Sequence, residues 1–510
     1  MNKFKLTAEH LERRRQARHA FSLRYDIFGS FVHQTVSQED YFDFCMEFPD
    51  EASKIIIDGM YSGDWFSVYE SEVLPMRHNH FLDRLREGGV DIIARHISAL
   101  RERGKECWIT HRISEVDIDM QQNPHTVKNA HPDWFIPAFG RLMNNMSVPE
   151  LCEHKLRVLS ELVEKYDIDG LDIDFERHTP ILPPGRQWEM RECVTDFMRA
   201  LRRMTLDMAK KNGRVIMLSA RVPDCLAGAH EDGLDIETWI DEDIIDGLTL
   251  GSRSFDVRVE EFRALSSEIF ITACYDPHHT VDGYTFPPLS LIHGVWHSHL
   301  SRGADGVEYF NWTGEGKWEV VDKYIKKYDL DQNRDGFVKY AHDDFGGAND
   351  AAFLAGVDKT YPTERRGGYP WGVGYGNLNA HSPLPMRIDG EGEVKLYVSD
   401  KVSDYSDAEI SLLFGELDAI PGIYLEDAKL ECKAHPTRDP QVTEADEAPV
   451  SGYGVSQKLL SGEDDSYPCT GLVASIAGMN IGPGYVTVRI SSEQPIKLEK
   501  FEIALKNKRK

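Results

Sequence analysis

Short apolar runs alternate with amphipathic stretches over the first two-thirds of the chain, and this alternation constrains the fold more than any other feature. Between the runs, as in 149–166 and 190–209, apolar residues recur with the period of a helix. Strand–helix–strand order predicts parallel strands with right-handed crossovers, and eight such strands in about 300 residues predict a (β/α)8 barrel. A doubly wound sheet is the alternative. The predicted strands lie at 22–29, 54–60, 105–113, 169–176, 214–221, 244–250, 268–275 and 305–312.

The pattern changes after residue 330, which divides the 510 residues into three parts. We assign residues 1–330 to the barrel. Residues 331–380 are rich in Gly, Asp and Tyr and predict an irregular connection packed on the barrel. Residues 381–510 contain short alternating strands separated by turn residues, which predict an antiparallel β-sandwich. All nine Trp lie at or before Trp371, so we interpret the sandwich as a structural accessory domain.

Composition excludes several classes of protein. Asp and Glu (85) exceed Lys and Arg (58), and the net charge of −27 disfavours a nucleic-acid partner. No apolar run reaches the roughly 18 residues of a membrane span, so no membrane partner is expected. Residues 1–20 lack the apolar core of a signal peptide. The predicted location is the cytoplasm, or the periplasm or exterior if a signal peptide has been removed; the oligomeric state is left open.

The fourth predicted strand carries the most informative motif, DGLDIDFE at 169–176. Strand residues alternate between faces, so three apolar side chains oppose three carboxylates: Leu171, Ile173 and Phe175 against Asp172, Asp174 and Glu176. In a barrel the carboxylates would face the interior, where like charges raise each other's pKa. One carboxyl can then stay protonated beside an ionised neighbour, as general acid catalysis at a glycosidic oxygen requires. Glu176 is nearest to the C-terminal mouth, where barrel active sites lie; an edge strand with a solvated acidic face is the alternative.

This motif resembles the D-G-x-D-x-D-x-E signature of glycoside hydrolase family 18, the chitinase family, at every fixed position: Asp169, Gly170, Asp172, Asp174 and Glu176. In that family the Glu is the general acid, and the Asp two residues earlier orients the acetamido group that acts as nucleophile. The resemblance implies these roles for Glu176 and Asp174. Trp312 is similar to the Trp that floors the chitinase sugar site. The third strand, CWITHRISEVD, departs from the family because it has no S-x-G-G.

Over most of its length the chain also resembles uncharacterised family-10-like glycosyl-hydrolase-like barrels. The shared features are a third strand with His111 and Arg112, the Y-D-I-D-G strand before Arg177, the R-V-P that begins at Arg221, and GADGVEYFNW at the last strand. This resemblance implies a barrel hydrolase with a C-terminal β-sandwich. The same resemblance argues against a mechanism in which an acetamido group of the substrate acts as the nucleophile.

A mechanism that is not substrate-assisted needs a second carboxyl, about 5–5.5 Å from the first for retention or 6.5–9.5 Å for inversion. Glu308 is expected to face inward, in phase with Phe310 and Trp312. Asp276 ends the seventh strand, a position often used for a nucleophile. Asp174 beside Glu176 is a further possibility, and each candidate has an ordinary salt-bridge role as its alternative. The candidates at strand ends are Asp58, Glu115, Asp224, Asp276 and Glu308.

Other residues at the strand ends are predicted to contact a substrate: Asp172, His111, Arg177, Asp276, Asn311 and Trp312. Arg112 and Arg221 could clamp an anionic sugar substituent or could instead neutralise the carboxylates. Five tryptophans could stack on sugar rings, and among them we retain only Trp312. The five are Trp65, Trp108, Trp134, Trp188 and Trp312.

Neither a metal nor a cofactor is predicted. The histidines show no H-E-x-x-H spacing. Asp331 to Gly336 matches half of a calcium loop, but His342 stands where the loop needs Glu, so we interpret the segment as a turn. The eight cysteines form no C-x-x-C, and pairing of Cys432 with Cys469 is left open.

We therefore predict a (β/α)8 glycoside hydrolase acting on an oligo- or polysaccharide, with anionic glycans included, and with Glu176 as acid/base, Asp174 as its electrostatic partner and Glu308 as a further candidate. Two alternatives remain. One is a non-catalytic carbohydrate-binding barrel, indicated by binding without turnover. The other is a metal-assisted hydrolase or lyase, indicated by loss of activity on chelation. Because fold alone does not set function, all three are hypotheses.

Overall fold

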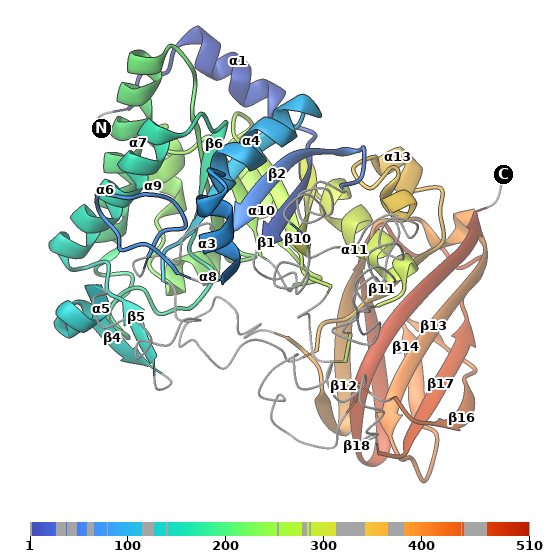
Figure 1. Ribbon diagram of the computed structural model, residues 1–510. Coiled ribbons are helices and arrows are strands. Elements are labelled where there is room, and N and C mark those ends of the chain that lie inside the picture. Colours follow the sequence, from blue (N-terminus) through green and yellow to red (C-terminus); the bar gives the residue numbers. More distant parts are fainter. Residues whose placement is uncertain are drawn as a thin grey trace.

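The first part of the chain forms the predicted closed barrel of eight parallel strands, with β1 paired to both β2 and β10 (Figure 1). The strands are β1 (Phe21–Asp26), β2 (Ala52–Asp58), β3 (Glu106–Arg112), β6 (Gly170–Asp174), β7 (Met217–Val222), β8 (Gly247–Leu250), β9 (Phe270–Tyr275) and β10 (Gly306–Trp312). The computed structural model describes residues 3–26, 37, 48–58, 66–78, 80–114, 127–138, 141–251, 254–277, 283–284, 287–312, 342–365, 382–439, 441–442 and 467–508.

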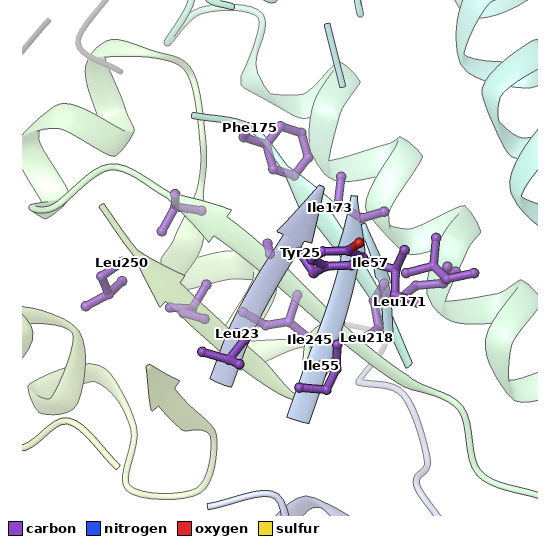
Figure 2. Packing of buried hydrophobic residues seen from close by; sticks show 14 of the residues in the cluster. Leu23, Tyr25, Ile55, Ile57, Leu171, Ile173, Phe175, Leu218, Ile245 and Leu250 are labelled. Carbon is purple, nitrogen blue, oxygen red and sulfur yellow. The ribbon is translucent and has the colours of Figure 1, made fainter. Parts of the chain in front are cut away.

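Helices surround the barrel, and the apolar side chains of the strands face them. Leu171 and Ile173 of β6 belong to the same buried cluster as Leu23 of β1 and Ile55 of β2 (Figure 2). The described helices around the barrel are α3 (His80–Glu87), α4 (Ile92–Glu102), α5 (Val127–Ala130), α6 (Pro149–Lys165), α7 (Arg191–Asn212), α8 (Leu226–Glu231), α9 (Ile236–Asp241), α10 (Val259–Leu265), α11 (Leu289–Ser301) and α13 (Ala351–Leu354), with a small hairpin of β4 (Phe135–Ala138) and β5 (Arg141–Asn144). In the helices of the described residues, no segment is long and apolar enough to cross a bilayer.

Large apolar side chains fill the barrel near its N-terminal end. Trp108 and Phe270 meet edge to face with ring centroids 6.0 Å apart. Glycines on neighbouring strands make room for both rings: a Cβ at Gly170 would lie 2.5 Å from Trp108, and one at Gly247 would lie 2.1 Å from Phe270. The Gly170 of the motif is therefore explained by packing, and the buried Lys54 places its Nζ against both rings, 4.7 Å from the centre of Trp108 and 4.9 Å from that of Phe270.

Helix α1 (Ala8–Gln16) closes the N-terminal end of the barrel through buried ionic contacts. Asp246, fully buried just before β8, accepts from His10 Nε2 (2.9 Å) and Arg14 Nε (3.0 Å). Arg202 of α7 lies 2.9 Å from the same carboxylate. Burial alone would raise the pKa of Asp246, but the charges of Arg202, His10 and Arg14 hold it well below its usual range.

We expect Asp246→Asn to lower the free energy of unfolding by about 3–5 kcal/mol, because Arg14 and Arg202 would lose their buried counter-charge. The measurement is urea unfolding of the mutant against the native protein. Asp243→Asn is the matched control, since Asp243 also pairs with Arg14 but its side chain is 18% exposed; it should cost about 1 kcal/mol or less. Equal effects of the two mutations would contradict the prediction.

The C-terminal part forms the predicted antiparallel sandwich, beside the barrel in Figure 1. Its strands are β11 (Lys359–Pro362), β12 (Met386–Val398), β13 (Tyr405–Gly415), β14 (Gly422–Leu425), β15 (Ala428–Lys429), β16 (Lys433–Thr437), β17 (Cys469–Ser475) and β18 (Gly484–Lys508). The first half of β18 pairs with β12 and β14, and its second half pairs with β11 and β13. Strand β11 lies in the segment 331–380 that was expected to be irregular. Cys432 and Cys469 are free thiols.

A buried polar cluster joins the barrel to the sandwich. Asp400, two residues after β12, is 3.1 Å from His297 Nδ1 of α11 and 3.1 Å from Lys359 Nζ of β11. Tyr361 also donates its hydroxyl to Asp400 (2.5 Å). Burial opposes ionisation, but the hydrogen bond and charge of His297 lower the pKa of Asp400 to about 2. This carboxylate therefore stays ionised and keeps the junction paired over the ordinary pH range.

Glu364 makes a second junction, at the mouth side of the barrel. Its carboxylate accepts from the backbone N–H groups of Phe255 and Asp256, in the connection after β8. With Asp224, just beyond β7, it lines a cavity of about 290 Å³ between the two parts of the chain. Burial and the neighbouring charge of Asp224 raise the pKa of Glu364 to about 8.

This raised pKa predicts that stability falls as the pH rises from about 4.5 to about 8. The folded state holds the Glu364 proton more tightly than the unfolded chain, in which the group has its ordinary value of 4.5. The stabilisation is complete below that value and is lost as the pH rises through about 8. Glu364→Gln keeps an acceptor for the two N–H groups, so its melting temperature should fall less than that of the native protein between about pH 6 and 9. The same change in melting temperature with pH for the native protein and Glu364→Gln would contradict this prediction.

Candidate active site

One guanidinium organises the carboxylates at the mouth end of β6. Arg221 of β7 donates from Nη2 to Asp174 Oδ2 (2.6 Å) and from Nη1 to Glu176 Oε2 (2.5 Å). The guanidinium also lies 4.4 Å from the ring centre of Phe310 on β10. Asp174 is fully buried and Glu176 is 6% exposed. The acidic face of the motif therefore points into the barrel, as predicted, with a fixed cation between its last two carboxylates.

Asp174 is held in its ionised form. Besides the Arg221 contact, its Oδ1 accepts from the backbone N–H groups of Glu176 (3.1 Å) and Arg177 (3.2 Å). Burial alone would raise the pKa of Asp174, but the charges of Arg221, Arg24 and Arg112 hold it well below its usual range. Both carboxylate oxygens are thus engaged by the protein, which leaves Asp174 poorly placed to turn toward a substrate acetamido group.

A second ionic layer lies beneath the first. Arg24 of β1 donates to Asp172 Oδ2 (2.8 Å) and to Glu308 Oε1 (2.9 Å). Thr110 and Ser219 also donate to Asp172, at 3.1 and 2.7 Å. Asp172 and Glu308 are fully buried. Their place in this lower layer favours a structural role for both, rather than the substrate-binding and catalytic roles that the sequence suggested.

The end of β10 departs from the predicted alternation. Asn311 has a φ of 59°, in the left-handed region, and the pairing of β10 with β1 shifts register there. The shift turns Trp312 to the side of Tyr309, with ring centroids 5.3 Å apart, and against Phe345 at 5.6 Å. Trp312 is 1% exposed. The expectation that Trp312 follows Glu308 and Phe310 into the interior is wrong, because the bulge reverses its direction.

The same bulge brings Asn311 to Asp276. Asn311 donates from Nδ2 to Asp276 Oδ2 (2.9 Å), and Asp276 directly follows β9. β9 is the seventh barrel strand and β6 the fourth, so three steps of the eight-strand ring separate them. Asp276 and Glu176 therefore follow strands that are three places apart around the mouth.

The third strand is only partly as predicted. Arg112 faces inward and donates from Nε and Nη2 to Asp58 Oδ2 of β2, at 3.1 and 2.9 Å. His111 faces outward instead, with Nε2 3.3 Å from Lys155 Nζ of α6. A substrate contact for His111 is therefore wrong, because strand alternation points it at the helices. Arg177 follows Glu176 at the mouth and is partly exposed.

Three residues of the site were not predicted from the sequence: Arg24, Thr110 and Ser219. Arg24 could have been predicted, since a charged residue in the middle of an apolar strand needs an oppositely charged partner inside the barrel. Glu115 and the segment 331–341 lie outside the described residues. Within the described part of the chain, no group of three or more His, Cys, Asp or Glu is arranged to hold a metal ion.

Comparison with known proteins finds similar folds only. No protein-family model and no curated protein matches the chain, so both family resemblances remain hypotheses. Among solved structures, an α-L-fucosidase from Paenibacillus thiaminolyticus has a TM-score of 0.38 and 14% identity, covering 61% of this chain and 49% of its own. The α-galactosidase AgaA from Geobacillus stearothermophilus has a TM-score of 0.34 and 11% identity, covering 92% and 58%.

A glycoside hydrolase family 18 N-acetylglucosaminidase from Paenibacillus barengoltzii gives a TM-score of 0.29 at 12% identity, over 50% of this chain and 68% of its own. These neighbours are glycoside hydrolases. The chain spans about half of the fucosidase and under three-fifths of the galactosidase.

Proposed function

We propose that the protein is a glycoside hydrolase that cleaves an oligo- or polysaccharide at the mouth of its barrel. The observation that carries the proposal is the inward placement of Asp174 and Glu176 at the C-terminal end of the fourth barrel strand, where one guanidinium holds both. Carboxyl groups at this end of a barrel are suited to acid–base chemistry on a glycosidic bond. Glu176 is the acid/base in this proposal, and Asp174 is a fixed negative charge beside it.

Asp276 is the proposed second carboxyl. Among the other candidates, Asp58 pairs with Arg112 and Glu308 pairs with Arg24 in the lower layer. Asp276 ends the seventh strand, and the Asn311 amide orients one of its oxygens. A direct role for Asp276 also agrees with the locked Asp174, which disfavours a substrate-assisted mechanism.

The proposed substrate is a neutral glycan. Arg112 and Arg221 were the candidates for binding an anionic substituent, but both face protein carboxylates at 2.5–3.1 Å. An anionic sugar would have to displace buried ion pairs, and breaking such pairs is costly.

A non-catalytic carbohydrate-binding barrel is the second candidate, and the Arg221–Glu176 contact favours it. An ion pair stabilises the charged carboxylate, whereas a general acid must donate a proton. Catalysis therefore requires substrate to weaken this contact when it binds.

The test is release of reducing ends from neutral, N-acetylated and anionic glycans by the native protein, with and without a chelator. Cleavage of a neutral glycan that a chelator leaves unchanged is the expected result. Binding of a glycan without any cleavage would favour the second candidate, and loss of activity on chelation would favour a metal-assisted enzyme.

A further inference from the structure

Among the described residues, one tryptophan is exposed, and it lies at the rim of the barrel. Trp188 is 40% exposed, whereas the other tryptophans of the described residues are buried or partly buried. It lies in the connection from β6 to α7, twelve residues after Glu176. His230, which contacts it, belongs to α8 in the connection after β7. Both connections leave the C-terminal ends of strands, which is the end that holds the candidate active site.

The indole is fixed in place. The ring of His230 lies 4.3 Å from it between centroids, and the guanidinium of Arg191 lies 4.4 Å from its centre. The connection itself is anchored by the buried side chains of Ile181 and Leu182. At Gly233 an added Cβ would lie 2.6 Å from the carbonyl oxygen of Gln187, so the two connections pack closely. A pre-organised ring of this kind binds with little further loss of conformational freedom.

Polar side chains with planar ends either contact the ring, as His230 and Arg191 do, or lie close to the tryptophan in the sequence or pair with His230. His230 Nε2 contacts Glu237 (2.9 Å), and Arg186 pairs with Glu189 (2.9 Å). The side chains of these four residues are between 36% and 67% exposed. An aromatic face beside exposed carboxylates and a guanidinium suits a sugar ring, which has one apolar face and a belt of hydroxyl groups.

A protein partner fits this surface less well. A specific protein interface buries about 1,200–2,000 Å² and has an apolar centre. The other large exposed apolar side chains of the described residues lie elsewhere: Leu11 on α1, Phe353 on α13, and Ile420 and Tyr485 in the sandwich. Trp188 is therefore an isolated ring in a polar setting.

We propose that Trp188 is the stacking platform of a remote sugar subsite on the β6–β7 side of the mouth. The glycan then extends along the rim beyond the bond that is cleaved, and the protein prefers long chains to short fragments. The inference rests on the proposed function for the position of cleavage, but sugar binding at Trp188 can be tested without cleavage.

The test is affinity electrophoresis in gels that contain laminarin, dextran, glycol chitin or alginate. At least one polymer should retard the native protein, and Trp188→Ala should bind that polymer about tenfold more weakly, equal to about 1.4 kcal/mol. Trp188→Tyr keeps a ring and should retain most of the binding. Phe353→Ala is the matched control, because Phe353 is also an aromatic residue with 40% exposure, and it should bind as the native protein does.

Kinetics then separate this inference from the proposed function. On a cleaved polymer, Trp188→Ala should raise KM about tenfold and leave kcat unchanged, while the shortest cleaved fragment should show no change. Retardation that needs Trp188 but occurs without cleavage would support the subsite and overturn the glycosidase. Equal retardation of native protein and Trp188→Ala, or no retardation by any polymer, would overturn the subsite.

Discussion

Glu176→Gln should reduce cleavage of the preferred glycan by about 10²–10⁴-fold, because the amide cannot supply the proton that the leaving oxygen needs. The substitution keeps the size of the side chain and an oxygen that can accept from Arg221 Nη1. Folding should therefore be retained, and the loss should appear in kcat. The measurement is steady-state kinetics of reducing-end release, with the melting temperature recorded for each variant.

Glu268→Gln is the control for this experiment, since Glu268 is an exposed carboxylate before the N-terminal end of β9, away from the mouth. It should cleave as the native protein does. Full activity of Glu176→Gln would remove this residue from the mechanism. Asp276→Asn would then be the next variant to measure, because Asp276 is the proposed second carboxyl.

Arg221→Met should lower the free energy of unfolding by about 3–5 kcal/mol, the largest stability effect expected for a residue of the site. The mutant keeps an unbranched apolar side chain but leaves Asp174 and Glu176 without their shared cation. Asp174 would then protonate more readily, since Arg221 is the main charge that lowers its pKa. The loss should therefore be greatest at neutral pH and smaller in acid.

The double mutant Arg221→Met/Asp174→Asn provides the internal check. Removing the charge that Arg221 neutralises should restore part of the lost stability, as for other buried pairs replaced together. Urea unfolding of both single mutants and the double mutant gives the coupling energy. Additive effects of the two mutations would show that the 2.6 Å contact between these residues contributes nothing to folding.

The barrel could be predicted because its signals are local. All eight strands were located within a few residues of their bounds, since each apolar run and each helical period lies in a short window. The inward direction of Asp174 and Glu176 followed from alternation alone. At Asn311 the same rule failed, because a single residue in the left-handed region reverses the direction of Trp312, which follows it.

The parts of the fold and of the site that were not predicted depend on contacts between distant segments. Glu364 reaches the backbone of Phe255 across 109 residues of sequence, and no local pattern marks it. The alternation of strand residues correctly predicted that Arg112 and Arg221 face inward. It could not show whether their guanidinium groups are already paired with carboxylates of the protein. The choice of Trp312 as the tryptophan that stacks on a sugar ring failed for a similar reason. Trp312 is buried, whereas Trp188 is exposed at the rim.

The 25-residue strand β18 also governs when the C-terminal part can form during synthesis. It is made after β11, β12, β13 and β14, and it pairs with all four. Until it emerges from the ribosome, those strands have no common partner, while the barrel strands before residue 313 already have theirs. The barrel can thus close first, and the nascent sandwich strands remain exposed to chaperones until the last strand arrives.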